Sequence, residues 1–184
     1  VYGLDMKGNC TFCNPACLSM LGYSDASSLL GKNMHQLIHH SHSDGSKFPV
    51  QECRIYQAFL KGEGTHVDNE VLWRSDGSSF AAEYRSYPIF QDKKIVGAVV
   101  SFTDITERKH YEVSLKEREA QLRQIIDLVP QLIFAKDWNG NYLLVNKATA
   151  DLYEMSIEEL MGLSHHGKHA STEEMEPFLR DDRE

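Results

Sequence analysis

The sequence predicts an α+β protein: one five-stranded antiparallel sheet with helices on one face, then a long helix and the beginning of a second such domain. Three observations lead to this fold class. A segment near the start of the chain is repeated about 131 residues later. Strand and helix patterns follow one another in an order that suits one antiparallel sheet. An apolar strand pattern then changes directly into a long, charged helix pattern at residues 101–112.

The repeat relates residues 3–31 to residues 135–162. Each copy has an Asp, a Gly-Asn turn, an Asn-x-Ala, a Ser and a closing Leu-x-Gly. The matched pairs are Asp5 and Asp137, Gly8 and Gly140, Asn9 and Asn141, Asn14 and Asn146, Ala16 and Ala148, Ser24 and Ser156, Leu29 and Leu160, and Gly31 and Gly162. A period of this length is far longer than that of a solenoid, so it indicates two copies of one domain.

The first copy begins with a predicted hairpin. Residues 1–5 and 10–14 have strand character, and Gly8 and Asn9 between them tolerate the positive φ of a tight turn. Two short helices follow this hairpin.

Both short helices have capping signals. Asn14 precedes Pro15, so we expect Asn14 to cap a helix that has proline in its first turn. Ser24 is expected to cap the next short helix. Asn146 and Ser156 are the corresponding caps in the second copy.

The rest of the first copy reads as one helix and a three-stranded meander. Apolar residues at helical spacing predict a helix over residues 51–62. Strand patterns at 66–75, 78–89 and 95–104 are separated by short polar turns, the first of which is Asp-Gly. The second copy has no such meander, so we expect it to be an incomplete domain.

The helix between the copies carries a heptad pattern. Apolar residues recur every seven positions in two sets, with one charged interruption: Tyr111, Arg118 and Ile125, and Leu115, Leu122 and Val129. This pattern favours a dimeric coiled coil of about three heptads. A simple amphipathic connector is the alternative.

Composition excludes several classes of function. The chain has 184 residues and a net charge of −8, which disfavours binding to nucleic acid or to an anionic membrane surface. No apolar run of about 18 residues is present, so no segment is expected to span a membrane. The chain begins inside an apparent strand and ends in a charged run, so we interpret it as a piece of a longer protein.

Four cysteines occur, three of them at Cys10, Cys13 and Cys17, and the fourth at Cys53. This uneven distribution is unlike a secreted disulfide framework and favours a reducing cytoplasm. Cys10 and Cys13 point to opposite faces of a strand, so the three clustered cysteines are expected to be core residues and not a joint zinc or redox site.

Several segments together resemble the PAS domain family. "GNCTFCNPA" and "GNYLLVNKA" resemble the signature that opens a PAS domain, "WRSDGSSFAAEYRSYPI" resembles its central hairpin, and "DITERK" resembles its closing Asp-Ile-Thr. The resemblance implies a first PAS domain at 1–106, a linker helix at 107–129 and the front half of a second PAS domain at 130–184.

Tandem PAS domains of this kind resemble the input regions of bacterial sensor histidine kinases. The resemblance implies a cytoplasmic sensory module that is not itself an enzyme, because neither a phosphoacceptor-helix pattern nor an ATP-binding Gly-rich segment is present. It also implies a downstream kinase domain in the same chain. We expect a homodimer that forms through the linker helix and through the outer sheet face, where Trp73 should point outward.

In the family, the sheet and helices enclose a ligand pocket. The light-sensing members have a reactive Cys that is missing from "GKNMHQLIHHSHSDG", and polar flavin contacts where this chain has Leu72, Ala82 and Phe102. These departures disfavour a light-sensing flavin site. The resemblance to redox sensors of the NifL and MmoS type, which hold FAD through other contacts, implies FAD as the expected ligand. The residues expected to bind the cofactor are Asn33, His35, His42, Leu72, Ala82, Tyr84, Ser86, Val100 and Phe102. No metal ligand is assigned.

The closing Asp-Ile-Thr is the expected signal relay. Asp104 would bond locally where the last strand meets the linker helix, and Thr106 would cap that helix, with Ile105 between them. A change in the pocket could then alter the position of the helix. The same residues could also be no more than good helix caps.

The histidines leave alternatives open. His35 and His39 have the i, i+4 spacing that can bind a metal on a helix, but a solvated His-rich loop over 35–42 is the favoured interpretation. Haem-based gas sensing is an alternative to flavin, although the helix that carries the haem ligand in the family has no His here, and His66 just after it is a poor substitute. A cofactor-free dimerisation and relay module is the remaining alternative.

Overall fold

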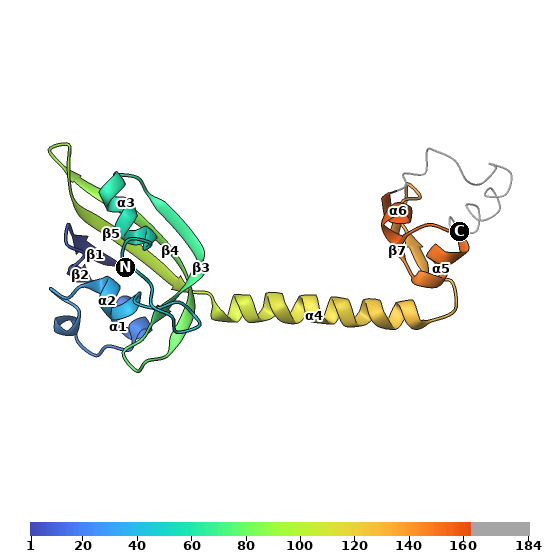
Figure 1. Cartoon of the computed structure of the whole chain (residues 1–184), viewed down its shortest axis with the longest axis horizontal. Coiled ribbons are helices and arrows are strands. Elements are labelled where there is room, and N and C mark those ends of the chain that lie inside the picture. Colours follow the sequence, from blue (N-terminus) through green and yellow to red (C-terminus); the bar gives the residue numbers. More distant parts are fainter. Residues whose placement is uncertain (163–184) are drawn as a thin grey trace. The chain divides into compact units, whose positions relative to one another are not determined.

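The structure is a computed structural model, and it describes residues 1–162. The chain forms two compact units, Val1–Val113 and a second that starts at Ser114 (Figure 1). The elements of the first unit are β1 (Tyr2–Asp5), β2 (Cys10–Cys13), α1 (Pro15–Leu21), the 3-10 helix η1 (Ala26–Ser28), α2 (Met34–Ile38), α3 (Arg54–Lys61), β3 (Thr65–Trp73), β4 (Ser79–Gln91) and β5 (Lys94–Asp104). The helix α4 (Thr106–Leu128) continues into the second unit.

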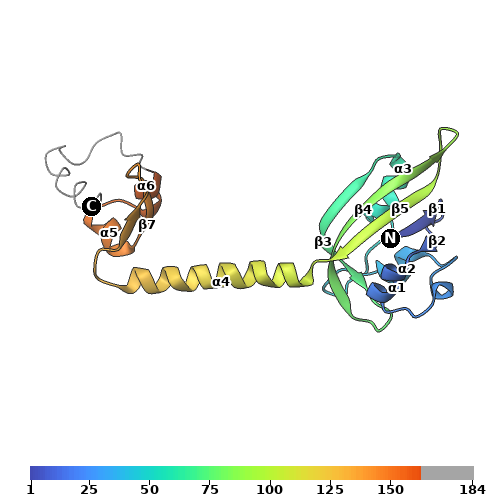
Figure 2. The ribbon, with the colours of Figure 1, turned by 180° about the vertical axis from the view of Figure 1, so that it is seen from behind.

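The first unit has the predicted five-stranded antiparallel sheet. Its strand order is β2-β1-β5-β4-β3, so the chain's first hairpin pairs with the last strand of the meander. Figures 1 and 2 show β2 and β3 at opposite edges, with α1, α2 and α3 packed against one face. The β4–β5 connection is a two-residue turn in which Asp92 and Lys93 both have positive φ, a geometry that matches strand twist.

The core lies between the helices and the inner face of the sheet. Leu21, Ile38 and Phe59 from the helices are fully buried against strand residues. Alternation along β4 and β5 places every second residue inside. Ala82, Tyr84, Ser86, Ala98 and Val100 are all at most 1% exposed.

An irregularity in β3 changes which of its residues face inward. Val67 pairs with Tyr84 and Glu70 pairs with Ala82, so three steps along β3 match two along β4. The extra residue is a β-bulge at Asp68 and Asn69, both of which are exposed. Because of this bulge, Glu70 points toward the inner side of the sheet.

The helix starts are partly as predicted. Asn14 and Asn146 each accept a hydrogen bond from the backbone N–H three residues on, as expected for caps. Ser156 caps its helix reciprocally with Glu159. The prediction for Ser24 was wrong, because Asp25 accepts the N–H of Ser27 and caps η1. The carboxylate of Asp25 makes the capping hydrogen bond, so the hydroxyl of Ser24, one residue earlier, is not the cap.

Two further expectations change. The helix predicted over 51–62 begins only at Arg54, after a turn. Trp73 is half-buried within its own domain, where its indole stacks on His40 and its Nε1–H donates to the carbonyl of Ser41 (2.9 Å). Through these contacts it packs on the α2–α3 loop of its own domain.

Among the described residues, the second unit has the elements of the front of the domain plan. Its elements are β6 (Phe134–Lys136), β7 (Tyr142–Val145), α5 (Lys147–Leu152) and α6 (Ile157–Gly162), with β6 and β7 as a two-stranded sheet. Residues 163–184, which the sequence analysis assigned to this half-domain, lie outside the described residues. No helix among residues 1–162 is long and apolar enough to cross a membrane.

Candidate functional site

The junction between β5 and α4 is held by hydrogen bonds to strand β4 and to the turn that joins β3 to β4. Asp104 accepts the N–H of Thr106 (2.9 Å) and the Nη2–H of Arg74 (2.7 Å). The N–H of Ile105, which is 4% exposed, donates to the carbonyl of Ala81 (2.8 Å). The first turn of α4 is thus fixed to the β3–β4 hairpin.

The local bond expected for Asp104 is present, but Thr106 has another role than the predicted cap. Its hydroxyl accepts the N–H of Ala81 (3.1 Å) and so contacts strand β4 instead of its own helix. Arg74 was missed by sequence reasoning. It also donates to the carbonyl of Met20 (3.1 Å) and lies 4.4 Å from the ring centre of Phe80.

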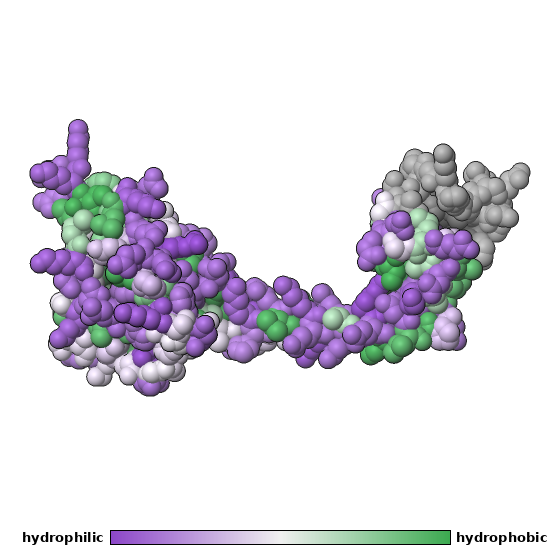
Figure 3. Space-filling model, viewed as in Figure 1, coloured by the Kyte–Doolittle hydropathy of each residue, from purple (hydrophilic) through white to green (hydrophobic). Residues whose placement is uncertain are grey.

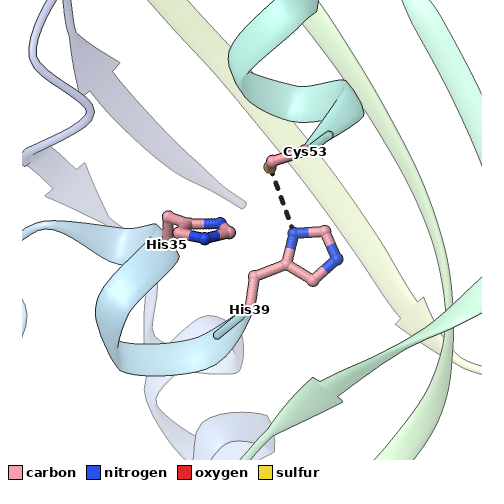
Figure 4. Close-up of side chains that lie close together, drawn as sticks. All are labelled: His35, His39 and Cys53. Atoms are coloured by element: carbon pink, nitrogen blue, oxygen red, sulfur yellow. Dashed lines mark hydrogen bonds between the residues drawn. The ribbon is translucent and has the colours of Figure 1, made fainter. Parts of the chain in front are cut away.

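A second feature is a cluster of His35, His39 and Cys53 (Figure 4), called here the His-Cys cluster. His35 lies on α2 and His39 at its C-terminal end, one helical turn apart, whereas Cys53 comes from the residue before α3. Their ligand-type atoms lie within 4.8 Å of one another. His39 is 1% exposed and Cys53 2%.

This burial corrects the favoured interpretation of the histidines as a solvated loop. Phe48, itself 6% exposed, covers the cluster with its ring against His35, His39 and His42. The spacing of four residues between His35 and His39 was visible in the sequence. Cys53 was not, since the loop that brings it back has no local signal.

The Nε2 atoms of His35 and His39 each lie close to an oxygen acceptor. Nε2 of His35 lies 3.0 Å from the carbonyl oxygen of Phe48. Nε2 of His39 lies 2.9 Å from Oε2 of Glu70, an ion-pair distance whose angle is poor for a hydrogen bond. The hydroxyl of Tyr84 donates to the same carboxylate oxygen (2.6 Å).

Charge inside the cluster shifts two pKa values in opposite directions. Burial by itself lowers the pKa of His39, but its contacts with Cys53 and Glu70 outweigh burial and raise that pKa to about 9. Burial raises the pKa of Cys53, but the nearby imidazoles of His35 and His39 outweigh burial and lower that pKa to about 6. These opposite shifts favour the imidazolium–thiolate form of the pair, in which Nδ1 of His39 and Sγ of Cys53 lie 3.3 Å apart.

A small internal cavity borders the cluster. Its volume is about 20 Å³, enough for one water molecule. It is lined by Tyr2, Leu4, Gly8, Asn33, Met34, His35, His39, Cys53, Ile55, Tyr56 and Phe59.

Two of the nine predicted cofactor residues, Asn33 and His35, line this cavity. Asn33 caps α2 and donates to the carbonyl of Lys7 (3.0 Å), and His42 is exposed in the α2–α3 loop. The other six lie in the core on the inner face of the sheet: Leu72, Ala82, Tyr84, Ser86, Val100 and Phe102. Tyr84, expected as a polar handle, uses its hydroxyl on Glu70.

These residues do not fit a flavin or a haem in this structure. Small-molecule pockets usually measure about 300–1,000 Å³, far more than the cavity behind this sheet. His66, the remote candidate for haem, is on the outer face and pairs with Glu83 (2.8 Å). Flavin and haem stay predictions, which the absorption spectrum of the purified chain tests.

Comparison with known proteins identifies the fold family. A PAS domain model matches residues 1–107, and another matches residues 120–183. Sporulation kinase A of Bacillus subtilis (strain 168) is 24% identical over 161 residues, which are 86% of this chain and 25% of that protein. The chain therefore spans about a quarter of the length of this relative.

One solved structure supports the fold, and a second is reported for comparison. An RNA-binding light-oxygen-voltage receptor aligns with a TM-score of 0.51 at 21% identity, covering 67% of this chain and 33% of that one. The PAS domain of nitrogen regulation protein NR(II) from Vibrio parahaemolyticus has a TM-score of 0.43 at 19% identity, covering 56% and 86%. With the sheet order, the helices and the closing Asp-Ile-Thr all in place, the chain belongs to the PAS domain family.

Proposed function

We propose that this chain is the sensory input segment of a cytoplasmic sensor histidine kinase, and that it is not itself catalytic. The first PAS domain passes its state through α4 to the second PAS domain and then to a kinase domain in the rest of the protein. The likeness to sporulation kinase A supports the kinase assignment. This proposal includes the extents of the first PAS domain (1–106), the linker helix (107–129) and the front half of the second PAS domain (130–184).

The observation that carries the proposal is the junction at Asp104–Thr106. All three residues bond to β3 or β4 or to the turn that joins them, so a shift of that hairpin moves the start of α4. The same hairpin carries Glu70 and Tyr84, which contact the His-Cys cluster. A path of direct contacts therefore leads from the His-Cys cluster through the β3–β4 hairpin to the start of α4.

Arg74→Ala tests this path. Loss of its bond to Asp104 should speed amide hydrogen exchange at Ile105 and Thr106 about tenfold, equivalent to about 1.4 kcal/mol. The control is Arg85→Ala, an exposed arginine on β4 that does not contact the junction. Equal exchange in the two variants would mean that the junction is held without Arg74, against the proposed relay.

Signal output can be tested in a chimaeric kinase. The matching segment of sporulation kinase A is exchanged for this chain, and autophosphorylation is compared between wild type, Arg74→Ala and Arg85→Ala. The proposal expects a several-fold change for Arg74→Ala alone. An active chimaera that is indifferent to Arg74→Ala would contradict a relay through this junction.

We also propose a homodimer that forms along α4. The helix has no buried residue, and its heptad positions Leu115, Leu122 and Ile125 are each about 60% exposed. Figure 3 shows α4 as mostly hydrophilic, with isolated green areas along it. A second copy of the same helix would cover the heptad positions.

Leu122→Lys should weaken this dimer at least tenfold, because it places two like charges in the apolar seam. Gln121→Lys adds the same charge at the neighbouring exposed position outside the seam and should leave the dimer intact. Light scattering coupled to size exclusion, over a range of concentrations, gives the dissociation constants. A monomeric wild type, or equal effects of both substitutions, would exclude α4 as the interface.

A further inference from the structure

The His-Cys cluster has more ligand-type groups than a single ion pair uses. The pair of His39 and Cys53 is complete in itself, with Glu70 on the far side of the imidazole. His35 adds a second imidazole, whose Nδ1 is buried and has no hydrogen-bond partner among residues 1–162. A buried nitrogen lone pair without a partner is unfavourable unless something binds it.

The protons of both imidazoles are directed away from the cluster. A backbone carbonyl accepts only, so its contact with His35 places that proton on Nε2. The carboxylate of Glu70 favours a proton on Nε2 of His39 in the same way. Nδ1 of His35 is then available as a lone pair, and Nδ1 of His39 becomes available once the proton that it shares with Sγ of Cys53 is lost.

This arrangement is typical of a metal site. Histidines that bind a metal usually donate their other N–H to a carboxylate or a backbone carbonyl, which fixes the tautomer and orients the ring. Here both acceptors are present, and the hydroxyl of Tyr84 in turn holds Glu70 (2.6 Å). Cys53 adds Sγ as a third donor atom beside the two imidazoles.

We propose that His35, His39 and Cys53 bind one transition-metal ion through Nδ1, Nδ1 and Sγ, with Zn²⁺ as the ion that fits best. A thiolate and two imidazoles suit Zn²⁺ and exclude Mg²⁺ and Ca²⁺, which require oxygen ligands. The donor atoms lie within 4.8 Å of one another. Zinc bonds of about 2.0–2.3 Å bring such atoms to within about 3.3–3.8 Å, so the cluster closes by about 1 Å.

Three protein ligands leave a fourth coordination position. The adjoining cavity of about 20 Å³ has room for a water molecule or a ligand of similar size at that position. On binding, the ion replaces the proton between Sγ of Cys53 and Nδ1 of His39, and that proton leaves to solvent. The metal site goes beyond the proposed relay, and the existence of the site does not depend on the relay.

The test is metal binding by the purified 184-residue chain, reduced and freed of metal with a chelator. Equilibrium dialysis should give one Zn²⁺ per chain. Co²⁺ should give the thiolate charge-transfer band and the intense visible bands of a tetrahedral site. His35→Ala and Cys53→Ser should each weaken binding at least 100-fold, and Glu70→Gln should weaken it about 10- to 100-fold by loss of the carboxylate that orients His39.

Matched controls come from the same chain. Cys10→Ser removes a buried thiol outside the cluster, and His42→Ala removes an exposed imidazole that also contacts Phe48. Both should bind Zn²⁺ like the wild type. If Cys53→Ser does not fold, the Co²⁺ spectrum of the wild type and the partly exposed His35→Ala still decide the result.

Two results would overturn the proposal. One is a wild type that binds no more Zn²⁺ than Cys53→Ser, which would make the cluster a thiolate–imidazolium pair. The other is a Co²⁺ spectrum that survives His35→Ala and disappears in Cys10→Ser, which would place the ion on the N-terminal cysteines. Neither result bears on hydrogen exchange at Ile105 and Thr106, so the relay is judged separately.

Discussion

Replacing Asn146 with alanine should destabilise the second unit by about 3 kcal/mol or more. Asn146 is fully buried, and its amide donates to the carbonyls of Ile126, Val129 and Gln131 at 2.8–3.2 Å. Its Oδ1 accepts from the backbone of Ile133 and from Thr149. One side chain thus joins the end of α4 to the first turn of α5, and alanine would leave these groups without partners.

Asn14 is the matched control, because it has the same place in the first repeat. It is exposed and accepts only from Cys17 and from the chain's first amino group, so Asn14→Ala should cost about 1 kcal/mol, as for an ordinary helix cap. Hydrogen exchange of β7 and of the first unit's core strands measures the two effects separately. Equal costs would mean that Asn146 is only a cap and does not hold α4.

Replacing Gly97 with alanine should destabilise the first unit by about 3 kcal/mol or more. Gly97 is buried on β5 opposite Asp5, and a Cβ there would overlap the backbone carbonyl of Leu4. A backbone atom cannot turn aside as a side chain can. Strand β1 would therefore have to move away from β5 and open the middle of the sheet.

Urea unfolding followed by the fluorescence of Trp73 measures this change. Ser101→Ala, an exposed position on the same strand, should alter the free energy of unfolding by less than about 0.5 kcal/mol. A Gly97→Ala variant as stable as Ser101→Ala would show that β1 and β5 tolerate a wider separation. It would also weaken the case that their close approach fixes the sheet.

The fold could be predicted from the sequence because the signals that indicate it are local. The Gly-Asn turns, the caps at Asn14 and Asn146, and the alternation along β4 each depend on neighbours within a few residues. One part of the junction at Asp104–Thr106 could be predicted for the same reason, and the other part could not. The bond between Asp104 and Thr106 is local, whereas Arg74 reaches Asp104 from 30 residues away.

The His-Cys cluster was largely hidden because long-range packing assembles it. His35 and His39 share a helix and could be paired by spacing alone. Cys53 and Glu70 come from a loop and a strand that only the folded chain brings to them. The burial of the histidines could not be predicted either, because Phe48, which covers them, belongs to a loop whose sequence is mostly polar.

The bulge at Asp68 and Asn69 has a consequence for how such a site is kept in evolution. Deletion of one of these exposed residues would remove the bulge, and Glu70 would stay opposite Ala82 on the inner face, with every member of the cluster unchanged. A homologue whose strand is one residue shorter can therefore keep the carboxylate that orients His39. When related genes are searched for this site, a gap of one residue at this point of an alignment does not rule a sequence out.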